Sequence, residues 1–116
     1  LPADSAVVLV VPLQVCGPCV DQSLAFAAQH RDAARLRTVV TQTQSPKATR
    51  LRLPEGLPTA PRVLIDTANA LAGVAPFHAH PTLVYYESGR IERVVGLLPG
   101  DVMGHLEAAG AYLTTP

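Results

Sequence analysis

The sequence predicts an α/β fold in which a central mixed sheet of four to five strands is flanked by helices, in the order β-α-β-α-β-β-α. A continuous run of β-branched apolar residues near the N-terminus predicts a strand buried on both faces. The next segment has helical spacing and leads to a second short strand, which is typical of a parallel β-α-β unit. Two β-rich runs joined by a tight turn then precede an amphipathic segment. With 116 residues, the chain is expected to form one domain, residues 1–116.

Ala6 to Leu13 carries the strongest strand pattern of the chain. Its sequence, AVVLVVPL, has no polar residue, so both faces of the strand should be covered and the strand should lie at the centre of the sheet. Pro12 has no N–H to donate to a neighbouring strand. We therefore expect regular pairing to stop at about Val11.

A helix is predicted to begin at Pro18, because proline lacks only an N–H that the first helical turn leaves unbonded. Apolar residues then recur at helical spacing as far as His30. Leu36 to Thr41 is rich in β-branched residues and predicts a second strand. It should run parallel to the first, because a helical crossover connects the two.

The middle of the chain has weaker patterns and many prolines. A short helix is expected from Lys47 to Leu53, followed by a loop. Arg62 to Asp66 predicts a short edge strand. Thr67 to Ala75 predicts one or two helical turns, with Thr67 as the N-cap residue.

The last third of the chain predicts a β-hairpin and a terminal helix. Thr82 to Glu87 and Arg90 to Val95 are β-rich and are separated by the two residues Ser88-Gly89. Asp101 is available as the N-cap of the helix. The apolar face of that helix should consist of Val102, Met103, Leu106, Ala109 and Leu113.

The charge balance argues against nucleic acid or an anionic membrane surface as a partner. Nine basic and nine acidic residues give a formal net charge of zero, so the chain lacks the basic footprint of such proteins. Its longest apolar run has eight residues, whereas a helix that spans a bilayer needs roughly 20. Because the sequence begins with Leu1 rather than Met, we expect a processed or trimmed chain from which a membrane tether could have been removed.

The two cysteines of the chain lie in Cys16-Gly17-Pro18-Cys19, between the predicted central strand and the predicted helix. The free amides of a helix N-terminus carry partial positive charge, so Cys16 should ionise more readily there than a free cysteine does. Cys19 lies one turn further into the helix, where its sulfur can attack a mixed disulfide formed at Cys16. The pattern indicates dithiol-disulfide exchange that requires no cofactor.

This CGPC motif, together with His80-Pro81-Thr82 followed by a strand, a turn, a strand and Gly96, resembles the thioredoxin superfamily over nearly the whole chain. The resemblance implies a thioredoxin fold and a cis peptide bond before Pro81. The loop at that proline would lie against the cysteines and offer backbone groups to a substrate chain. Residues 63–66 (VLID), with the short helix and proline loop after them, look most like bacterial membrane-tethered thioredoxin-like reductases.

The resemblance also implies an activity and partners. CGPC in this family usually indicates a reductant, so we expect an enzyme that reduces protein disulfides and takes part in electron transport. Its partners would be protein thiols or disulfides and an upstream electron donor that the sequence does not identify. The tethered relatives imply an extracytoplasmic, membrane-anchored protein, with the cytoplasm as the alternative.

The surface around Cys16 is expected to be apolar and to accept an extended peptide by strand-like pairing. Phe77 and Leu97 should border this surface. Besides the two cysteines, the expected substrate-binding or tuning residues are Val15, Gly17, Pro18, His80, Pro81 and Gly96.

Three positions depart from the family's pattern. Val15 stands where thioredoxins have Trp, Val10 where they bury an acid, and Gln22 where the tethered reductases often have Glu. The usual proton acceptor for Cys19 is therefore missing. Its proton is expected to pass to water, to an imidazole or to Asp66.

His80 is the most unusual substitution, because the family mostly places an aliphatic residue or Thr before this proline. An imidazole titrates near neutral pH. A protonated His80 would stabilise the Cys16 thiolate, whereas a neutral one could accept a proton during resolution. Either role predicts activity that depends on pH between roughly 5 and 8.

Two alternatives remain open. The missing acid and Trp are compatible with a redox-inert thioredoxin-like module that binds a partner through the same groove. Cys16 and Cys19 with His78 and His80 would supply two thiolates and two imidazoles to zinc. The His-x-His spacing is shorter than in zinc fingers and a core of this size folds without metal, so we expect no metal site.

Overall fold

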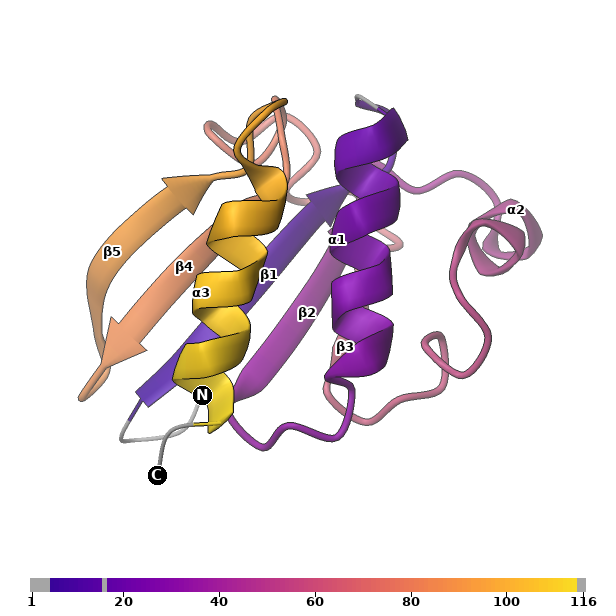
Figure 1. Cartoon of the computed structure of the whole chain (residues 1–116). Coiled ribbons are helices and arrows are strands. Elements are labelled where there is room, and N and C mark those ends of the chain that lie inside the picture. Colours follow the sequence, from indigo (N-terminus) through magenta and orange to yellow (C-terminus); the bar gives the residue numbers. More distant parts are fainter. Residues whose placement is uncertain (1–4, 16, 115–116) are drawn as a thin grey trace.

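The computed structural model describes residues 5–15 and 17–114, which form one five-stranded sheet and three helices (Figure 1). The order is β-α-β-α-β-β-β-α, which is the predicted order with the short edge strand included. The elements are β1 Ser5–Pro12, α1 Gly17–Gln29, β2 Leu36–Thr41, α2 Pro46–Arg52, β3 Val63–Ile65, β4 Thr82–Glu87, β5 Arg90–Gly96 and α3 Val102–Thr114.

Strand β1 lies at the centre of the sheet, whose strand order is β3-β2-β1-β4-β5. It pairs in parallel with β2 and antiparallel with β4, so the sheet is mixed as predicted. Val7, Leu9 and Val11 are fully buried on one face, and Val10 is 2% exposed on the other. Burial on both faces explains why the run has no polar residue.

Strand β1 pairs with β2 beyond Val11, where Pro12 had predicted that regular pairing would stop. With β4 it ends at Val10, but with β2 it extends to Pro12, and the N–H of Leu13 donates to Thr41 O at 3.0 Å. The N–H groups of Val7 and Leu13 both donate towards β2, which places the nitrogen of Pro12 on the opposite side of the strand. The missing N–H therefore faces the side where pairing with β4 has already ended.

Helices α1 and α3 lie side by side across one face of the sheet (Figure 1). Each begins within a residue of the predicted start. Both bury one side against the strands, and the core lies in this layer. The buried helix residues of that core are Cys19, Val20, Leu24, Phe26, Ala27, Val102, Leu106 and Ala109.

Helix α2 begins one residue earlier than predicted because Ser45 caps it. Its Oγ accepts from the N–H of Ala48 at 3.2 Å, and Pro46 occupies the first turn. A guanidinium nitrogen of Arg52 lies 3.5 Å from a carboxylate oxygen of Asp21, which joins α2 to α1. The Asp21 side chain is 71% exposed and the Arg52 side chain 38%, so water screens this ion pair and it contributes little to stability.

The segment after β3 forms successive turns instead of the predicted helix. Thr67 is not the capping residue: the Asp66 carboxylate accepts from the N–H groups of Ala70 and Leu71, both at 2.9 Å. Asn69 takes a positive φ of 54°, which a regular helix cannot contain. The hydrogen bonds to Asp66 and the left-handed backbone of Asn69 outweigh the helical propensity of the alanines in the segment.

The hairpin of β4 and β5 turns at Ser88 and Gly89, as predicted. Their φ angles are 53° and 77°, which matches the tight hairpin turn with two left-handed residues. A register shift between Tyr85 and Tyr86 marks a bulge in β4. Tyr85 is buried and Tyr86 is half-buried.

A stack of aromatic rings and guanidinium groups fixes α3 to the sheet. The rings of Tyr85 and Tyr112 meet edge to face with centroids 5.3 Å apart. Arg93 lies 4.4 Å from the Tyr85 centroid and Arg35 lies 4.7 Å from the Tyr112 centroid. Arg35 also donates to the backbone oxygen of Tyr112. Burial raises the pKa of Tyr85, and the nearby Arg93 opposes that rise.

Replacing Tyr112 by alanine should lower the free energy of unfolding by about 2–3 kcal/mol, since the ring joins α3 to β4 and to Arg35. Tyr112→Phe keeps the ring and loses only the bond from its hydroxyl to Glu87 (3.0 Å), so it should cost less than about 1 kcal/mol. Urea unfolding of both variants measures the difference. Equal losses would show that the hydroxyl, and not the ring, holds the helix.

Candidate functional site

The cysteine motif lies at the junction of β1 and α1, as the sequence predicted. Cys16 itself lies outside the described residues, and α1 begins at the next residue, Gly17. The first turn of α1 has no acidic side chain that could neutralise the positive end of the helix. An anionic group at this terminus would therefore be stabilised by unopposed backbone dipoles.

Cys19 lies in the first turn of α1 with its side chain turned into the core. It is 3% exposed and belongs to the main hydrophobic cluster. Its carbonyl accepts from the hydroxyl of buried Ser23 at 2.7 Å. A cysteine placed in this way is protected from solvent and from a bulky substrate.

The strand register brings the second half of the predicted site to the same edge of the sheet. Val10 pairs with Thr82, and Thr82 pairs with Gly96, so the end of β1, the start of β4 and the end of β5 meet there. Pro81 is buried directly before β4, and its carbonyl accepts from the N–H of Leu97 at 2.8 Å. The structure therefore gathers the loops of both predicted motifs at one end of the sheet (Figure 1).

The cis peptide bond predicted before Pro81 is not found. In residues 5–15 and 17–114 the cis bond is the one between Ala75 and Pro76. The bond between His80 and Pro81 thus has the trans form, which an X-Pro bond favours by about 0.5–1 kcal/mol. The prediction was correct about the place of Pro81 in the fold and wrong about its geometry.

The surface around the motif differs from the expected one at Leu97. Leu97 is fully buried and so belongs to the core, while its neighbour Leu98 is 49% exposed. Val15 is half-buried and packs against the core cluster. Pro18 is exposed, and Phe77 is half-buried.

The His80 ring is half-buried and held by its own loop. Its Nδ1 lies 3.2 Å from Pro81 O and 3.3 Å from Thr82 Oγ1. A Cβ atom built on Gly96 would lie 2.5 Å from His80 Cε1, which is closer than real Cβ contacts. The ring therefore rests against Gly96, and only glycine leaves room for it there.

Asp66 is a structural residue of this edge and not the proton relay that the sequence suggested. One carboxylate oxygen accepts from Thr41 Oγ1 at 2.8 Å and from the N–H of Leu71, and the other accepts from the N–H of Ala70. Desolvation raises the pKa of Asp66, but these three hydrogen bonds outweigh it, and the pKa lies below its ordinary value. The carboxylate is ionised at neutral pH and is a poor proton acceptor.

Gln42 is a site residue that the sequence analysis missed. Its side chain donates to Ala72 O at 3.2 Å and to His78 O at 2.9 Å, and accepts from the N–H of Gln14 at 3.2 Å. It thereby joins the segment before Cys16 to the loop before Pro81. Its φ of 55° is uncommon for a residue other than glycine. The signal in the sequence was a polar residue directly after a buried parallel strand.

The described residues hold no group of three or more metal-ligating side chains. His78 is exposed, and its carbonyl accepts from Gln42. The nitrogen Nδ1 of His80 already faces oxygen atoms of its own loop.

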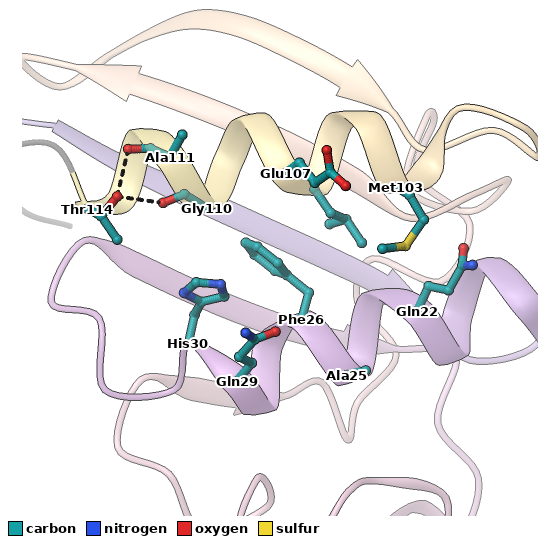
Figure 2. Close-up of a pocket in the computed structure, with 11 residues that line it drawn as sticks. Gln22, Ala25, Phe26, Gln29, His30, Met103, Glu107, Gly110, Ala111 and Thr114 are labelled. Atoms are coloured by element: carbon teal, nitrogen blue, oxygen red, sulfur yellow. Dashed lines mark hydrogen bonds between the residues drawn. The ribbon is translucent and has the colours of Figure 1, made fainter.

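A cavity lies between α1 and α3, and none of the described residues of the cysteine motif lines it. Figure 2 shows it between α1 and α3, with Phe26 and Met103 facing it and Gln29 and Glu107 at its border. Its volume is about 550 Å³. The His30 and Phe26 rings pack against each other there, with centroids 4.4 Å apart.

Two solved structures have a similar arrangement. The exposed lipoprotein thioredoxin Etrx1 of Streptococcus pneumoniae strain TIGR4 aligns with a TM-score of 0.54 and 16% identity, covering 91% of this chain and 85% of its own. A protein described as the thiol:disulfide interchange protein DsbE of Chlorobium tepidum aligns with a TM-score of 0.54 and 18% identity, covering 96% of this chain and 81% of its own. The chain has the thioredoxin fold.

No family model matches the chain, and no curated protein matches it in sequence. The thioredoxin fold predicted from the two motifs is thus confirmed by architecture. Within the described residues, the helices are too short or too polar to cross a bilayer.

Asp66→Asn should lower the free energy of unfolding by about 1–3 kcal/mol at pH 7, because an amide cannot accept all three hydrogen bonds. The folded carboxyl has a pKa below the unfolded value of about 3.9, so its contribution is complete above that pH and is lost as the pH falls below it. Urea unfolding at pH 7 and pH 3 should show the difference from the wild type shrinking at pH 3. Asp32→Asn, on an exposed residue, is the control, and a difference that stays constant with pH would contradict this assignment.

Proposed function

We propose that this protein is a thiol-disulfide oxidoreductase that reduces disulfides of other proteins. The observation that carries the proposal is the CGPC sequence at the junction of the central strand and α1, with Cys19 buried in the first helical turn. The thioredoxin fold supports this reading. One of the two similar structures is described as a thioredoxin, and the other as a thiol:disulfide interchange protein.

The reaction consists of two thiol-disulfide exchanges. The Cys16 thiolate attacks a substrate disulfide, forms a mixed disulfide with one substrate sulfur and releases the other as a thiolate. Cys19 then loses its proton and attacks the sulfur of Cys16, which releases the second substrate thiolate. Two electrons pass from the Cys16 and Cys19 dithiol to the substrate, and the released thiolates take up protons. An upstream dithiol donor must reduce the new disulfide again.

The burial of Cys19 supports the order of attack. A buried sulfur cannot meet a protein disulfide first, but it can attack a neighbouring sulfur in the same motif. Exposed Pro18 and half-buried Phe77 and Gly96 lie on the same edge of the fold and would border the bound substrate chain. Backbone groups there would pair with an extended peptide and give little selectivity for its side chains.

We also propose an extracytoplasmic location for the complete protein, with a membrane tether outside residues 1–116. The support is the resemblance to tethered reductases, together with a similar structure that is described as an exposed lipoprotein. Fractionation of cells that produce the complete protein tests this location.

Cys16→Ser should reduce the catalysed reduction of insulin by dithiothreitol to the uncatalysed rate, because the attacking sulfur is lost. Cys19→Ser should also stop turnover but should trap a mixed disulfide, visible as a shifted band on a non-reducing gel. Ala25→Ser, on the exposed side of the same helix, is the matched control and should keep full activity. Wild-type protein without catalysis would instead support a redox-inert binding module.

The Cys16 and Cys19 pair should have a reduction potential near or below about −250 mV, as expected of a reductant. Equilibration with dithiothreitol or glutathione buffers, followed by thiol alkylation, measures it. The metal content of the same sample tests the zinc alternative. A potential above roughly −180 mV would show that the protein is an oxidant or isomerase.

A further inference from the structure

A polar pocket lies between the end of β1 and α2, and we call it the α2 pocket. Its volume is about 260 Å³, and its lining residues are Leu13, Gln14, Gln44, Thr49 and Arg52. Gln14 precedes Cys16 by two residues, so the covalent chain keeps their Cα atoms within about 8 Å of each other. One wall of the pocket is therefore next to the cysteine motif.

Arg52 connects the α2 pocket to both ends of the motif. One guanidinium nitrogen lies 3.5 Å from Leu13 O, on the chain before the cysteines. The other lies 3.5 Å from a carboxylate oxygen of Asp21, two residues after Cys19. In Figure 1, α1 lies between α3 and α2. The α2 pocket thus borders the motif on the side away from α3.

Thr49 indicates independently that this pocket holds a ligand. The residue lines the pocket and is 3% exposed, yet its Oγ1 has no hydrogen-bond partner among the described residues. A buried hydroxyl without a partner is unfavourable, because it has lost its hydrogen bonds to water. A bound acceptor would complete its hydrogen bonding.

The charges around the pocket favour an anion. Helix α2 carries Lys47, Arg50 and Arg52 within seven residues and no acidic residue. Both contacts of the Arg52 guanidinium, at 3.5 Å, are longer than the usual range of about 2.7–3.2 Å. A ligand carboxylate can therefore replace the exposed Asp21 and form two parallel hydrogen bonds with the guanidinium.

We propose that the α2 pocket binds the carboxylate of an acidic side chain in the substrate protein, close to the disulfide that is reduced. Arg52 would hold it, and Thr49 and Gln44 would each donate one hydrogen bond. Arg52 is the one cation among the described lining residues, which matches a singly charged carboxylate better than a phosphate dianion. The substrate class rests on the proposed function, whereas carboxylate binding does not.

The first experiment measures carboxylate binding without reductase activity. The probe is N-acetylglutamic acid α-amide, whose one charge is its side-chain carboxylate, and N-acetylglutamine amide is the neutral control. At millimolar concentrations the probe should shift the NMR signals of the Arg52 side-chain N–H and the Thr49 methyl group in a saturable way, and the control should not. Unchanged signals would overturn the carboxylate site.

The second experiment measures substrate selectivity. The reduced protein reacts in a single turnover with disulfide peptides that have blocked termini and differ only in Glu or Gln at one position, moved stepwise along both sides of the reactive cysteine. Where Glu reaches the pocket, it should increase the rate about tenfold over Gln, the gain expected of one hydrogen bond to a charged group. A Glu/Gln ratio near one at every position would overturn the substrate assignment.

Variants with opposite effects separate the pocket from a structural role. Arg52→Gln should bring the Glu/Gln ratio close to one. Arg50→Gln removes the same charge from the same helix outside the pocket, so it is the matched control and should keep the ratio. Asp21→Asn should raise the ratio, because it removes the competing carboxylate. Equal losses in Arg52→Gln and Arg50→Gln would show general attraction to a basic helix and overturn the pocket.

Thr49→Val tests the buried hydroxyl. Valine has nearly the same shape, and the hydroxyl has no partner to lose among the described residues, so urea unfolding should show unchanged or higher stability. The Glu/Gln ratio should fall. An unchanged ratio would contradict the contact with Thr49.

The two experiments distinguish failure of the pocket from failure of the proposed function. Saturable probe binding by a protein that reduces no peptide would overturn the proposed function and leave the carboxylate site standing. Probe binding with a Glu/Gln ratio near one would assign the pocket to a free carboxylate and overturn its role in substrate selection.

Discussion

The burial of β1 on both faces is the constraint on which the rest of the structure depends. The residues from Ala6 to Pro12 are all apolar, and such a strand is stable when sheet neighbours and other layers cover both of its faces. Parallel pairing with β2 requires a crossover, which α1 supplies, and antiparallel pairing with β4 brings the hairpin to the other side. The carboxyl end of β1 therefore leads into the cysteine motif at the start of a helix. The packing that forms the core therefore also positions the cysteine motif.

Hydrogen bonds between loops then define the edge where the motifs meet. Gln42 joins the segment before the cysteines to the loop before Pro81, and Asp66 holds the turns between β3 and that loop. The backbone of Gln42 has a positive φ, which is uncommon for a residue other than glycine. Backbone of this kind persists where surrounding interactions favour it, and it is frequent near functional sites. Hydrogen bonds from side chains to the backbone, and not regular secondary structure, hold these loops in place.

Proton transfer is the point at which this site departs from the usual thioredoxin pattern. Val10 is buried where the family has an acid, and Asp66 is occupied by three hydrogen bonds. His80 lies on the site edge, and its Nδ1 faces oxygen atoms of its own loop.

The sequence by itself determined the central strand, the crossover, the hairpin and the place of the cysteine motif, because apolar periodicity and turn residues act locally. It could not determine the role of Asp66, the link through Gln42 or the trans bond before Pro81. The first two depend on groups that are distant in the sequence, since Asp66 is bonded by Thr41 and Gln42 by Gln14. Only the tertiary structure brings such groups within hydrogen-bond or van der Waals distance, and it thereby decided how the loops of the site are held.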